Sequence, residues 1–333
     1  MITTTIRLIT LLVCITLPIK LQAASQPMTV ILDTDIASDI DDVGALTLLN
    51  YYESTGHCKI LAVIVDQRLS ASADACKEID SYWGHGYIPV GQEYDPRALS
   101  DTSVYAAKIA AGMNALTGPT FNSTQLYRKT LAGQAHGNVT IICIGHETAF
   151  DDLLRSASDS NSSLSGRDLV KAKVSRVVIM GGDYSLVPNL SFKTVSPEYN
   201  FCTDAVSTAD MVTNLNLLRI PTYYIGFTLG NEIPIGGATT RLPFNSPLRE
   251  AYSLYDGNRA RSGWDVVAAH FAIVGTGENF NATRGSNAAN PINGSNSFTV
   301  NPEGSQYYVT LVGPPKSETD TLNSIYDDCP PSK

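Results

Sequence analysis

The sequence lacks three features that would place it in common protein classes. It has no run of lysine and arginine and a formal net charge of −9, which argues against a nucleic-acid backbone or an anionic membrane as partner. It has no Cys-x-x-Cys pair and no cluster of cysteine and histidine, so a zinc site is not expected. After residue 24, no stretch approaches the ~20 apolar residues that a membrane-spanning helix requires.

The N-terminal segment, residues 1–24, has the composition of a secretory signal peptide. A basic residue, Arg7, precedes an apolar stretch from Leu8 to Ile19, and small residues follow before the segment ends. We therefore expect a secreted, extracellular protein in which residues 25–333 form one α/β domain. The leader carries two basic residues and no acidic residue, so the rest of the chain is more acidic than the whole.

Cysteine and asparagine motifs bear on this expected export. Five cysteines follow the leader, so at least one is expected to be a free or intermolecular thiol, and their pairing cannot be deduced from the sequence. Asn-x-Ser/Thr motifs predict a glycoprotein if the chain passes through a eukaryotic secretory pathway. The six motifs lie at Asn122, Asn138, Asn161, Asn189, Asn281 and Asn293.

Apolar, β-branched runs alternate with helical patterns over much of the chain. The runs are nearly continuous, which is typical of parallel strands in a sheet that helices cover on both faces. The sequence therefore predicts an α/β fold with a mostly parallel, Rossmann-like open sheet, in which ligands bind at the C-terminal strand ends. The expected strands are 28–32, 59–65, 139–144, 174–180 and 221–225, with 306–312 as an edge strand, and the expected helices are 43–52, 71–83, 104–116, 147–155 and 205–216.

The most unusual stretch follows the first expected strand and holds five aspartates within ten residues. Like charges this close repel one another unless a cation or a helix N-terminus offsets them. Capping of the next helix explains only part of the cluster, because a helix start offers about four free N–H groups. A hard divalent metal is the simplest counter-charge, and calcium suits several carboxylates better than zinc does. The cluster consists of Asp33, Asp35, Asp39, Asp41 and Asp42.

This stretch resembles the signature of the inosine–uridine preferring nucleoside hydrolase family. The match is to the branch with the longer Asp-Thr-Asp-x-Gly-x-Asp-x-Asp-Asp motif, with Ala37 where glycine is usual. Other pieces match in the same order along the chain, from about residue 28 to residue 275. They are Pro89-Val90-Gly91, Ile144-Gly145, Val178-Ile179-Met180-Gly181-Gly182, Pro197-Glu198-Tyr199-Asn200-Phe201, Ile225-Gly226-Phe227 and Trp264-Asp265-Val266.

The resemblance implies a calcium-dependent enzyme that hydrolyses the N-glycosidic bond of ribonucleosides to free base and ribose. Such a reaction passes through an oxocarbenium-like state, so it needs an activated water and a group that stabilises charge on the sugar. The implied partner is a small-molecule nucleoside, with no nucleic acid and no membrane. Dimers and tetramers are common in the family, so the resemblance also implies a homo-oligomer.

The resemblance assigns roles residue by residue. The general base is Asp35, which also touches the metal. The remaining metal ligands are Asp42, the backbone carbonyl of Ile144, and Asp265. Two further carboxylates, Asp33 and Asp39, would support the ligands from behind. The substrate would contact Asp41, Met180, Glu198, Asn200 and Trp264.

Two departures from the family pattern keep alternatives open. Trp264 stands where nucleosidases often have a histidine that assists the leaving base, and an indole cannot shuttle a proton near neutral pH. Gln67 replaces an asparagine that commonly contacts the reacting centre. A catalytically weak ribose- or nucleoside-binding protein is therefore the main alternative. A phosphatase of the strand-Asp-x-Asp type is a weaker one, because only Gly182-Asp183 resembles its later acidic motif.

Overall fold

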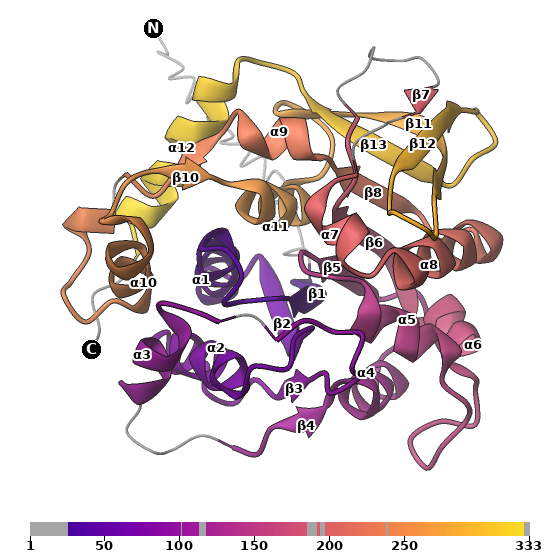
Figure 1. Cartoon of the computed structure of the whole chain (residues 1–333), viewed down its shortest axis with the longest axis horizontal. Helices are drawn as coiled ribbons and strands as arrows, with labels where there is room; N and C mark the ends of the chain where they lie inside the picture. The colour runs from indigo at the N-terminus through magenta and orange to yellow at the C-terminus, as the bar shows by residue number, and fades with distance from the viewer. Residues whose placement is uncertain are drawn as a thin grey trace, which may run out of the picture.

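A computed structural model describes residues 26–100, 102–112, 118–184, 192–193, 197–237 and 239–329 of the chain. The expected signal peptide and the motif at Asn189 lie outside these residues. One large sheet runs through the middle of the molecule (Figure 1), with the strand order β4-β3-β2-β1-β5-β6-β8-β13-β11-β12-β7. A separate pair, β9 and β10, is antiparallel.

The strands of the large sheet are β1 (Met28–Thr34), β2 (Cys58–Val65), β3 (Val90–Gln92), β4 (Phe121–Asn122), β5 (Val139–Cys143), β6 (Val174–Met180), β7 (Phe192–Lys193), β8 (Thr222–Ile225), β11 (Phe280–Ala289), β12 (Asn296–Val300) and β13 (Gln306–Leu311), and the small pair is β9 (Pro234–Ile235) and β10 (Arg261–Ser262). From β4 to β13 all neighbouring strands are parallel. The pairs beyond β13 are antiparallel. The expected mostly parallel α/β sheet is confirmed.

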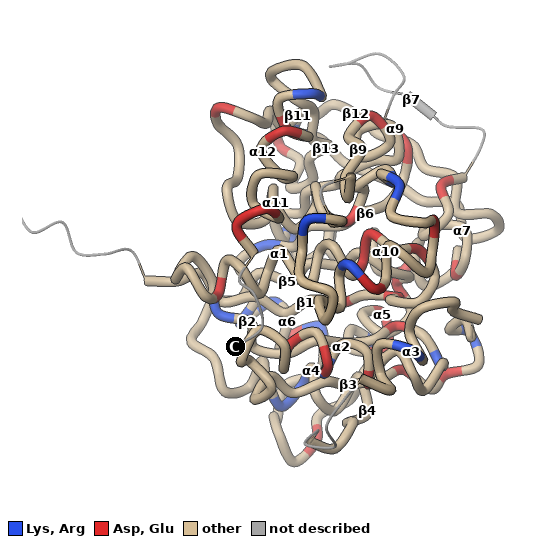
Figure 2. The backbone as a smooth tube through the Cα atoms, turned by 90° about the vertical axis from the view of Figure 1, so that its left-hand side faces the viewer, with Lys and Arg blue, Asp and Glu red and all other residues tan. Residues whose placement is uncertain are grey.

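The helices are α1 (Asp41–Ser54), α2 (Ser70–Tyr82), α3 (Ala106–Ala111), α4 (Ser123–Ala132), α5 (Thr148–Arg155), α6 (Gly166–Lys173), α7 (Tyr199–Thr203), α8 (Ala205–Leu218), α9 (Phe227–Asn231), α10 (Pro247–Asp256), α11 (Trp264–Val274) and α12 (Pro315–Asp327), with a short 3-10 turn at Thr239–Arg241. None of the helices within the described ranges is long and apolar enough to cross a bilayer. Lysines and arginines are scattered along the chain rather than gathered in one stripe (Figure 2).

Helices cover both faces of the sheet, and this explains the nearly continuous apolar strands. Along β1, Val30 and Leu32 face one hydrophobic core, which also contains side chains of α1, α2, α10, α11 and α12. Ile31, between them, faces a second core with side chains of α4, α5, α6 and α8. Because successive side chains of a strand point to opposite faces, both faces must be apolar when both are covered.

The strand order reverses direction at β1, and this places the aspartate cluster. β1 pairs with β2 on one side and with β5 on the other. The next strands along the chain, β2 to β4, therefore extend the sheet in one direction, and β5, β6 and β8 extend it in the other. A crevice forms at such a switch point beyond the C-terminal strand ends. The loop of residues 35–40 joins β1 to α1 at that crevice, and the tips of β5 and β6 lie beside it.

Two expectations need correction or completion. The stretch at 306–312 is not an edge strand, because β13 pairs with β8 on one side and with β11 on the other. The expected helix at 104–116 appears as the shorter α3, and residues 113–117 lie outside the described part. The five cysteines among the described residues are free thiols, and of these five Cys202 alone is exposed.

Candidate active site

A pocket of about 400 Å³ opens beyond the C-terminal ends of β1, β5 and β6. Its residues come from parts of the chain up to 230 positions apart, and they include most of the residues singled out in the sequence. The lining consists of Asp35, Ser38, Asp39, Asp41, Asp42, Ile144, Met180, Glu198, Tyr199, Asn200, Phe227, Arg261, Trp264 and Asp265. Of the expected site residues, only Asp33 lies behind the pocket rather than on its surface.

Three buried carboxylates form the most compact acidic group. Asp41, Asp42 and Asp265 each offer an oxygen, and these atoms lie within 4.8 Å of one another. The Thr34 hydroxyl donates to Asp42, and the backbone N–H of Asp265 donates to Asp41 Oδ2 at 3.0 Å. The N-terminus of α1 thus meets the N-terminus of α11, which is why positions far apart in the chain share one group.

Burial and mutual repulsion shift the titration of these carboxyls. Burial, followed by the charge of Asp39, raises the pKa of Asp41 to about 8. Burial raises the pKa values of Asp42 and Asp265 well above the ordinary range, and neighbouring carboxylates add to both shifts. A cation beside these groups would stabilise their ionised forms and oppose these shifts. Hard oxygen donors without sulfur or imidazole fit a cation such as calcium.

The loop that carries Asp39 is held by side chains from elsewhere. Ala37 has φ of 116°, a backbone conformation that favours glycine, which agrees with the glycine usual at this place in the motif. The Tyr105 hydroxyl accepts from the Ala37 N–H at 2.7 Å and donates to the Asp39 carbonyl. Gln67 Nε2 donates to the Asp35 carbonyl at 2.8 Å. Gln67 therefore fixes the loop from behind and does not line the pocket.

Asp35 has a close neighbour that sequence reasoning missed. His146 is almost fully buried, and its Nε2 lies 3.2 Å from Asp35 Oδ2. Gly145 allows this approach, because a Cβ there would lie 2.5 Å from the Asp35 nitrogen. The only signal in the sequence was the position of His146 two residues after Ile144, at an expected strand tip.

Glu198 and Asn200 are ordered by the backbone around them. The Glu198 carboxylate accepts the N–H groups of Asn200, Phe201 and Gly182 at 2.8 to 3.1 Å, so it caps α7. Burial raises its pKa to about 7, and these three hydrogen bonds oppose that shift. Asn200 Nδ2 donates to the carbonyls of Ile144 at 3.0 Å and Met180 at 3.2 Å. The two side chains are thus buried at the pocket rather than spread over an exposed face.

The two residues expected to support the ligands have different environments. Asp33 is fully buried and accepts from the Tyr127 hydroxyl, and burial raises its pKa. Asp39 lines the pocket, and Arg261 Nε donates to Asp39 Oδ1 at 3.1 Å. Sequence reasoning missed Arg261, because it lies in the two-residue strand β10, outside any recognised motif.

Aromatic side chains line the same pocket as the carboxylates. The rings of Phe227 and Trp264 stack with centroids 5.6 Å apart. The Arg261 guanidinium lies over the Trp264 ring, 5.1 Å from its centre. Trp264 Nε1 donates to the Phe227 carbonyl at 2.8 Å. Tyr199 also lines the pocket and is half exposed. Phe227 and Tyr199 belong to two of the matching motifs, but the resemblance assigned no role to either residue.

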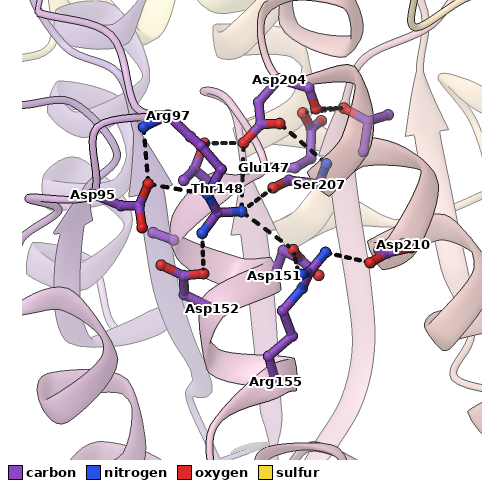
Figure 3. Close-up of polar contacts among 12 residues, drawn as sticks. Asp95, Arg97, Glu147, Thr148, Asp151, Asp152, Arg155, Asp204, Ser207 and Asp210 are labelled. Carbon is purple, nitrogen blue, oxygen red and sulfur yellow. Dashed lines mark hydrogen bonds and ion pairs between the residues drawn. The ribbon is translucent and has the colours of Figure 1, made fainter. Parts of the chain in front are cut away.

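Figure 3 shows a second acidic group, the Arg97 cluster. None of its residues is among those that line the pocket. Arg97 Nε is 3.0 Å from Asp95 Oδ1, and its Nη1 donates to the Ser207 hydroxyl at 2.7 Å. Arg155 Nε is 2.7 Å from the buried carboxylate of Asp151. The cluster consists of Asp95, Arg97, Asp151, Asp152, Arg155, Asp204, Ser207 and Asp210.

Solved structures of nucleoside hydrolases share this fold. An inosine–uridine preferring nucleoside hydrolase from Bacillus anthracis has a TM-score of 0.67 and 17% identity, over 90% of this chain and 99% of that one. A plant nucleoside hydrolase, PpNRh1, has a TM-score of 0.66 and 15% identity, over 91% and 98%. The type III effector XopQ, complexed with adenosine diphosphate ribose, has a TM-score of 0.66 and 17% identity, over 92% and 95%.

Sequence comparisons with protein-family models and with curated proteins find no relative, so the similarity rests on structure alone. No protein-family model matches the chain, and no curated protein matches it. At 13 to 17% identity, the solved structures establish that this chain has the nucleoside-hydrolase fold. Its activity depends on the side chains of the pocket.

Proposed function

We propose that the protein is a calcium-dependent N-ribosyl hydrolase that cleaves ribonucleosides to free base and ribose. The observation that carries the proposal is the convergence of Asp35, Asp42, Glu198, Asn200 and Asp265 on one pocket at the switch point of the sheet. The nucleoside-hydrolase fold supports it. The oxygen donors at this pocket match a hard cation, and the neighbouring polar groups match the hydroxyls of a sugar.

The reaction can be written with side chains of this chain. Asp35 accepts a proton from the attacking water, whose oxygen forms a bond to C1′ of the ribose as the C1′–N bond breaks. The electron pair of that bond stays on the base nitrogen, and the base takes up a proton from solvent water. Positive charge that develops on the sugar lies among carboxylates, which stabilise it. Glu198, Asn200 and Asp41 bind the ribose hydroxyls, and Met180 packs against the ring. His146, beside Asp35, orients its carboxylate.

Calcium would be held by Asp35, Asp42, Asp265 and the carbonyl of Ile144. It would polarise the bound water and offset the repulsion among the carboxylates. Asp41 belongs to the same compact group of oxygens, so it is the nearest addition to this ligand set. Asp33, hydrogen-bonded to Tyr127 behind the pocket, and Asp39, paired with Arg261, would support the ligands.

The direct test is ribose release. The purified protein is incubated with a panel of purine and pyrimidine nucleosides, and reducing sugar is measured with calcium and with an excess of chelator. We expect ribose release that stops on chelation and returns when calcium is restored. Failure to release ribose from any riboside, with one calcium bound per chain, would leave the protein as a binding protein only.

That binding protein is the second candidate, and one observation favours it. The N–H of Trp264 is donated to the Phe227 carbonyl, so it is not available to a leaving base. Calorimetric titration with a nucleoside, run beside the ribose assay, separates tight binding without turnover from hydrolysis. The phosphatase alternative has little support, because Asp183 is outside the pocket lining and accepts from the Thr228 hydroxyl at 3.3 Å.

We also propose that the protein is secreted and glycosylated. Asn138, Asn161, Asn281 and Asn293 are exposed, as glycan attachment requires. Expression in a eukaryotic secretory host should yield a medium-borne protein whose mass falls on treatment with an endoglycosidase. The homo-oligomer implied by the family resemblance stays a prediction, and light scattering coupled to gel filtration would test it.

A further inference from the structure

The pocket is lined by both carboxylates and aromatic rings. Six carboxylates line it, and the single guanidinium among the lining residues, that of Arg261, is already paired with Asp39. A bound divalent cation and the Arg261 guanidinium would together carry three positive charges, fewer than the six carboxylates of the lining. Such a pocket favours a cationic ligand and opposes an anionic one such as a phosphate ester.

The aromatic rings suit the face of a flat, positively charged ring. Phe227 and Trp264 present stacked rings, and Tyr199 stands at the pocket on the first turn of α7. The negative faces of aromatic rings attract cations at distances up to about 6 Å. The Arg261 guanidinium already packs over the Trp264 ring in this way, so this ring has a geometry that suits a planar cation.

The lining of the pocket has few groups that could donate a proton to a leaving base. Among the described residues that line it there is no histidine and no lysine. The Trp264 N–H is donated to a backbone carbonyl, and His146 is buried behind the lining, beside Asp35. The remaining O–H donors of the lining are the hydroxyls of Ser38 and Tyr199, and hydroxyl groups give up protons far less readily than an imidazolium does.

We propose that the preferred substrates are N-ribosyl heteroaromatic cations, such as N-ribosylpyridinium compounds, in preference to neutral nucleosides and to 5′-phosphorylated ribosides. This inference rests on the N-ribosyl hydrolase activity proposed above. When water attacks C1′, the C1′–N bond breaks and its electron pair neutralises the ring nitrogen. The pyridine leaves uncharged without any proton, and the proton released by the water passes to Asp35 and then to solvent.

The first experiment compares substrates on the calcium-loaded wild-type protein. The probes are 3-carbamoylpyridinium riboside, its 5′-phosphate, and the neutral substrates inosine, uridine and 5-fluorouridine. We expect kcat/KM for the pyridinium riboside to exceed that for inosine and uridine at least tenfold, and its 5′-phosphate to be at least tenfold poorer. Without proton donation to the base, 5-fluorouridine should also react at least tenfold faster than uridine, because its base is the better anionic leaving group.

Pyridinium ribosides and neutral nucleosides also differ in intrinsic reactivity, so a second experiment compares binding alone. The uncleavable 3-carbamoylphenyl C-riboside has nearly the same shape as the pyridinium riboside and no charge. In the Asp35→Asn protein, calorimetry should give a Kd for the cation at least tenfold lower than for the neutral analogue. The Phe227→Leu change, which removes one aromatic face, should weaken binding of the cation at least threefold and that of the neutral analogue less.

The outcomes separate the two proposals. The substrate preference is wrong if kcat/KM for neutral nucleosides equals that for the pyridinium riboside, or if the C-riboside and the cation have equal Kd values. In either case the hydrolase assignment stands. If uridine and 5-fluorouridine react at equal rates, a proton donor assists the base and the preference loses its cause. If no riboside is cleaved, both proposals fail.

Discussion

Two groups of carboxylates follow the C-terminal strand ends, and they differ in what lies opposite them. In the Arg97 cluster, carboxylates converge on two guanidinium groups (Figure 3), and burial raises the pKa of Asp151 only to about 6, because Arg155 and Arg97 oppose the shift. In the pocket, Asp41, Asp42 and Asp265 face one another. The pKa of Asp41 rises to about 8.

The presence or absence of an arginine opposite the carboxylates indicates a structural role for the Arg97 cluster and a binding role for the pocket. A carboxylate with an arginine from its own chain is already neutralised, and its removal leaves a cation unpaired. Carboxylates that share a small volume without a cation of the chain store repulsion that an added ion relieves. The number of aspartates is similar in the two places, so the count of acidic residues alone does not identify a metal site.

The largest contrast is expected in catalysis. Asp35→Asn keeps the size of the side chain but cannot accept the proton of water, and loss of a general base lowers rates by ~10²–10⁴-fold. We expect kcat for ribose release to fall by about that factor with little change in the melting temperature. The matched control is Asp95→Asn in the Arg97 cluster, which should leave kcat within about twofold of wild type. Equal losses in both variants would show that the assay reports folding rather than chemistry.

The next contrast is the dependence of stability on pH after chelation. Asp41 has an ordinary pKa of 3.8 and a pKa of about 8 in the folded protein, so between these values the folded state holds a proton that the unfolded state releases. By linkage, the stability of the metal-free protein falls as pH rises from about 4 to 8. Calcium binding requires ionised carboxylates, so the gain in melting temperature on adding calcium should grow over the same range.

Thermal unfolding with and without calcium at pH 5, 6, 7 and 8 measures this growth. In Asp265→Asn the calcium-dependent gain should be much smaller at every pH, whereas in Asp95→Asn it should equal that of wild type. A calcium effect that is constant with pH would mean that the carboxylates of the pocket are already ionised without a metal.

The fold and the main acidic residues could be predicted because their signals are local. Asp35, Asp41 and Asp42 follow one buried strand and begin one helix, and a chain segment with this pattern has few other ways to fold. Asp265 was found through a motif at the start of a helix. What the motifs did not give was the contact between Asp41 and the Asp265 N–H, which depends on how α1 and α11 pack.

The partners of these residues could not be predicted, because the sequence does not say which distant segments meet. Arg261 pairs with Asp39, which is more than two hundred positions away in the sequence. The two residues of β10 carry no sequence pattern that predicts an ion pair. His146 gave no periodic signal, since a buried histidine resembles a packing residue until its neighbour is known. The sheet beyond β13 was missed because β11 and β12 are rich in Asn, Ser and Gly, which favour turns.

A third contrast concerns stability alone. Arg97→Met removes the guanidinium that faces Asp95, Asp151 and Asp152, and Asp151 is fully buried. The side chain of Arg97 is one-third exposed, so solvent screens part of the loss, and we expect the free energy of unfolding to fall by about 2 kcal/mol. Calcium affinity should not change. Urea unfolding measures the first quantity, and calcium titration followed by calorimetry measures the second.

The smallest effect is expected for Arg261, an arginine that pairs with a carboxylate at the pocket itself. Arg261 pairs with Asp39 at the pocket, and Asp39 is the neighbouring charge that contributes most to the raised pKa of Asp41. Both partners are partly exposed, so Arg261→Gln should lower the free energy of unfolding by less than about 1 kcal/mol. The same change unmasks the charge of Asp39 and should tighten calcium binding by roughly twofold to fivefold.

The direction of this last effect distinguishes the two groups of carboxylates. Loss of an arginine at the Arg97 cluster costs stability and leaves calcium affinity unchanged, whereas loss of Arg261 costs little stability and improves affinity. Calcium titrations at 0.05 M and 0.5 M salt sharpen the test, because screening should reduce the gain from Arg261→Gln at the higher salt concentration. Weaker calcium binding in this variant would mean that Arg261 orders the loop of Asp39, and that its charge matters less than its hydrogen bonds.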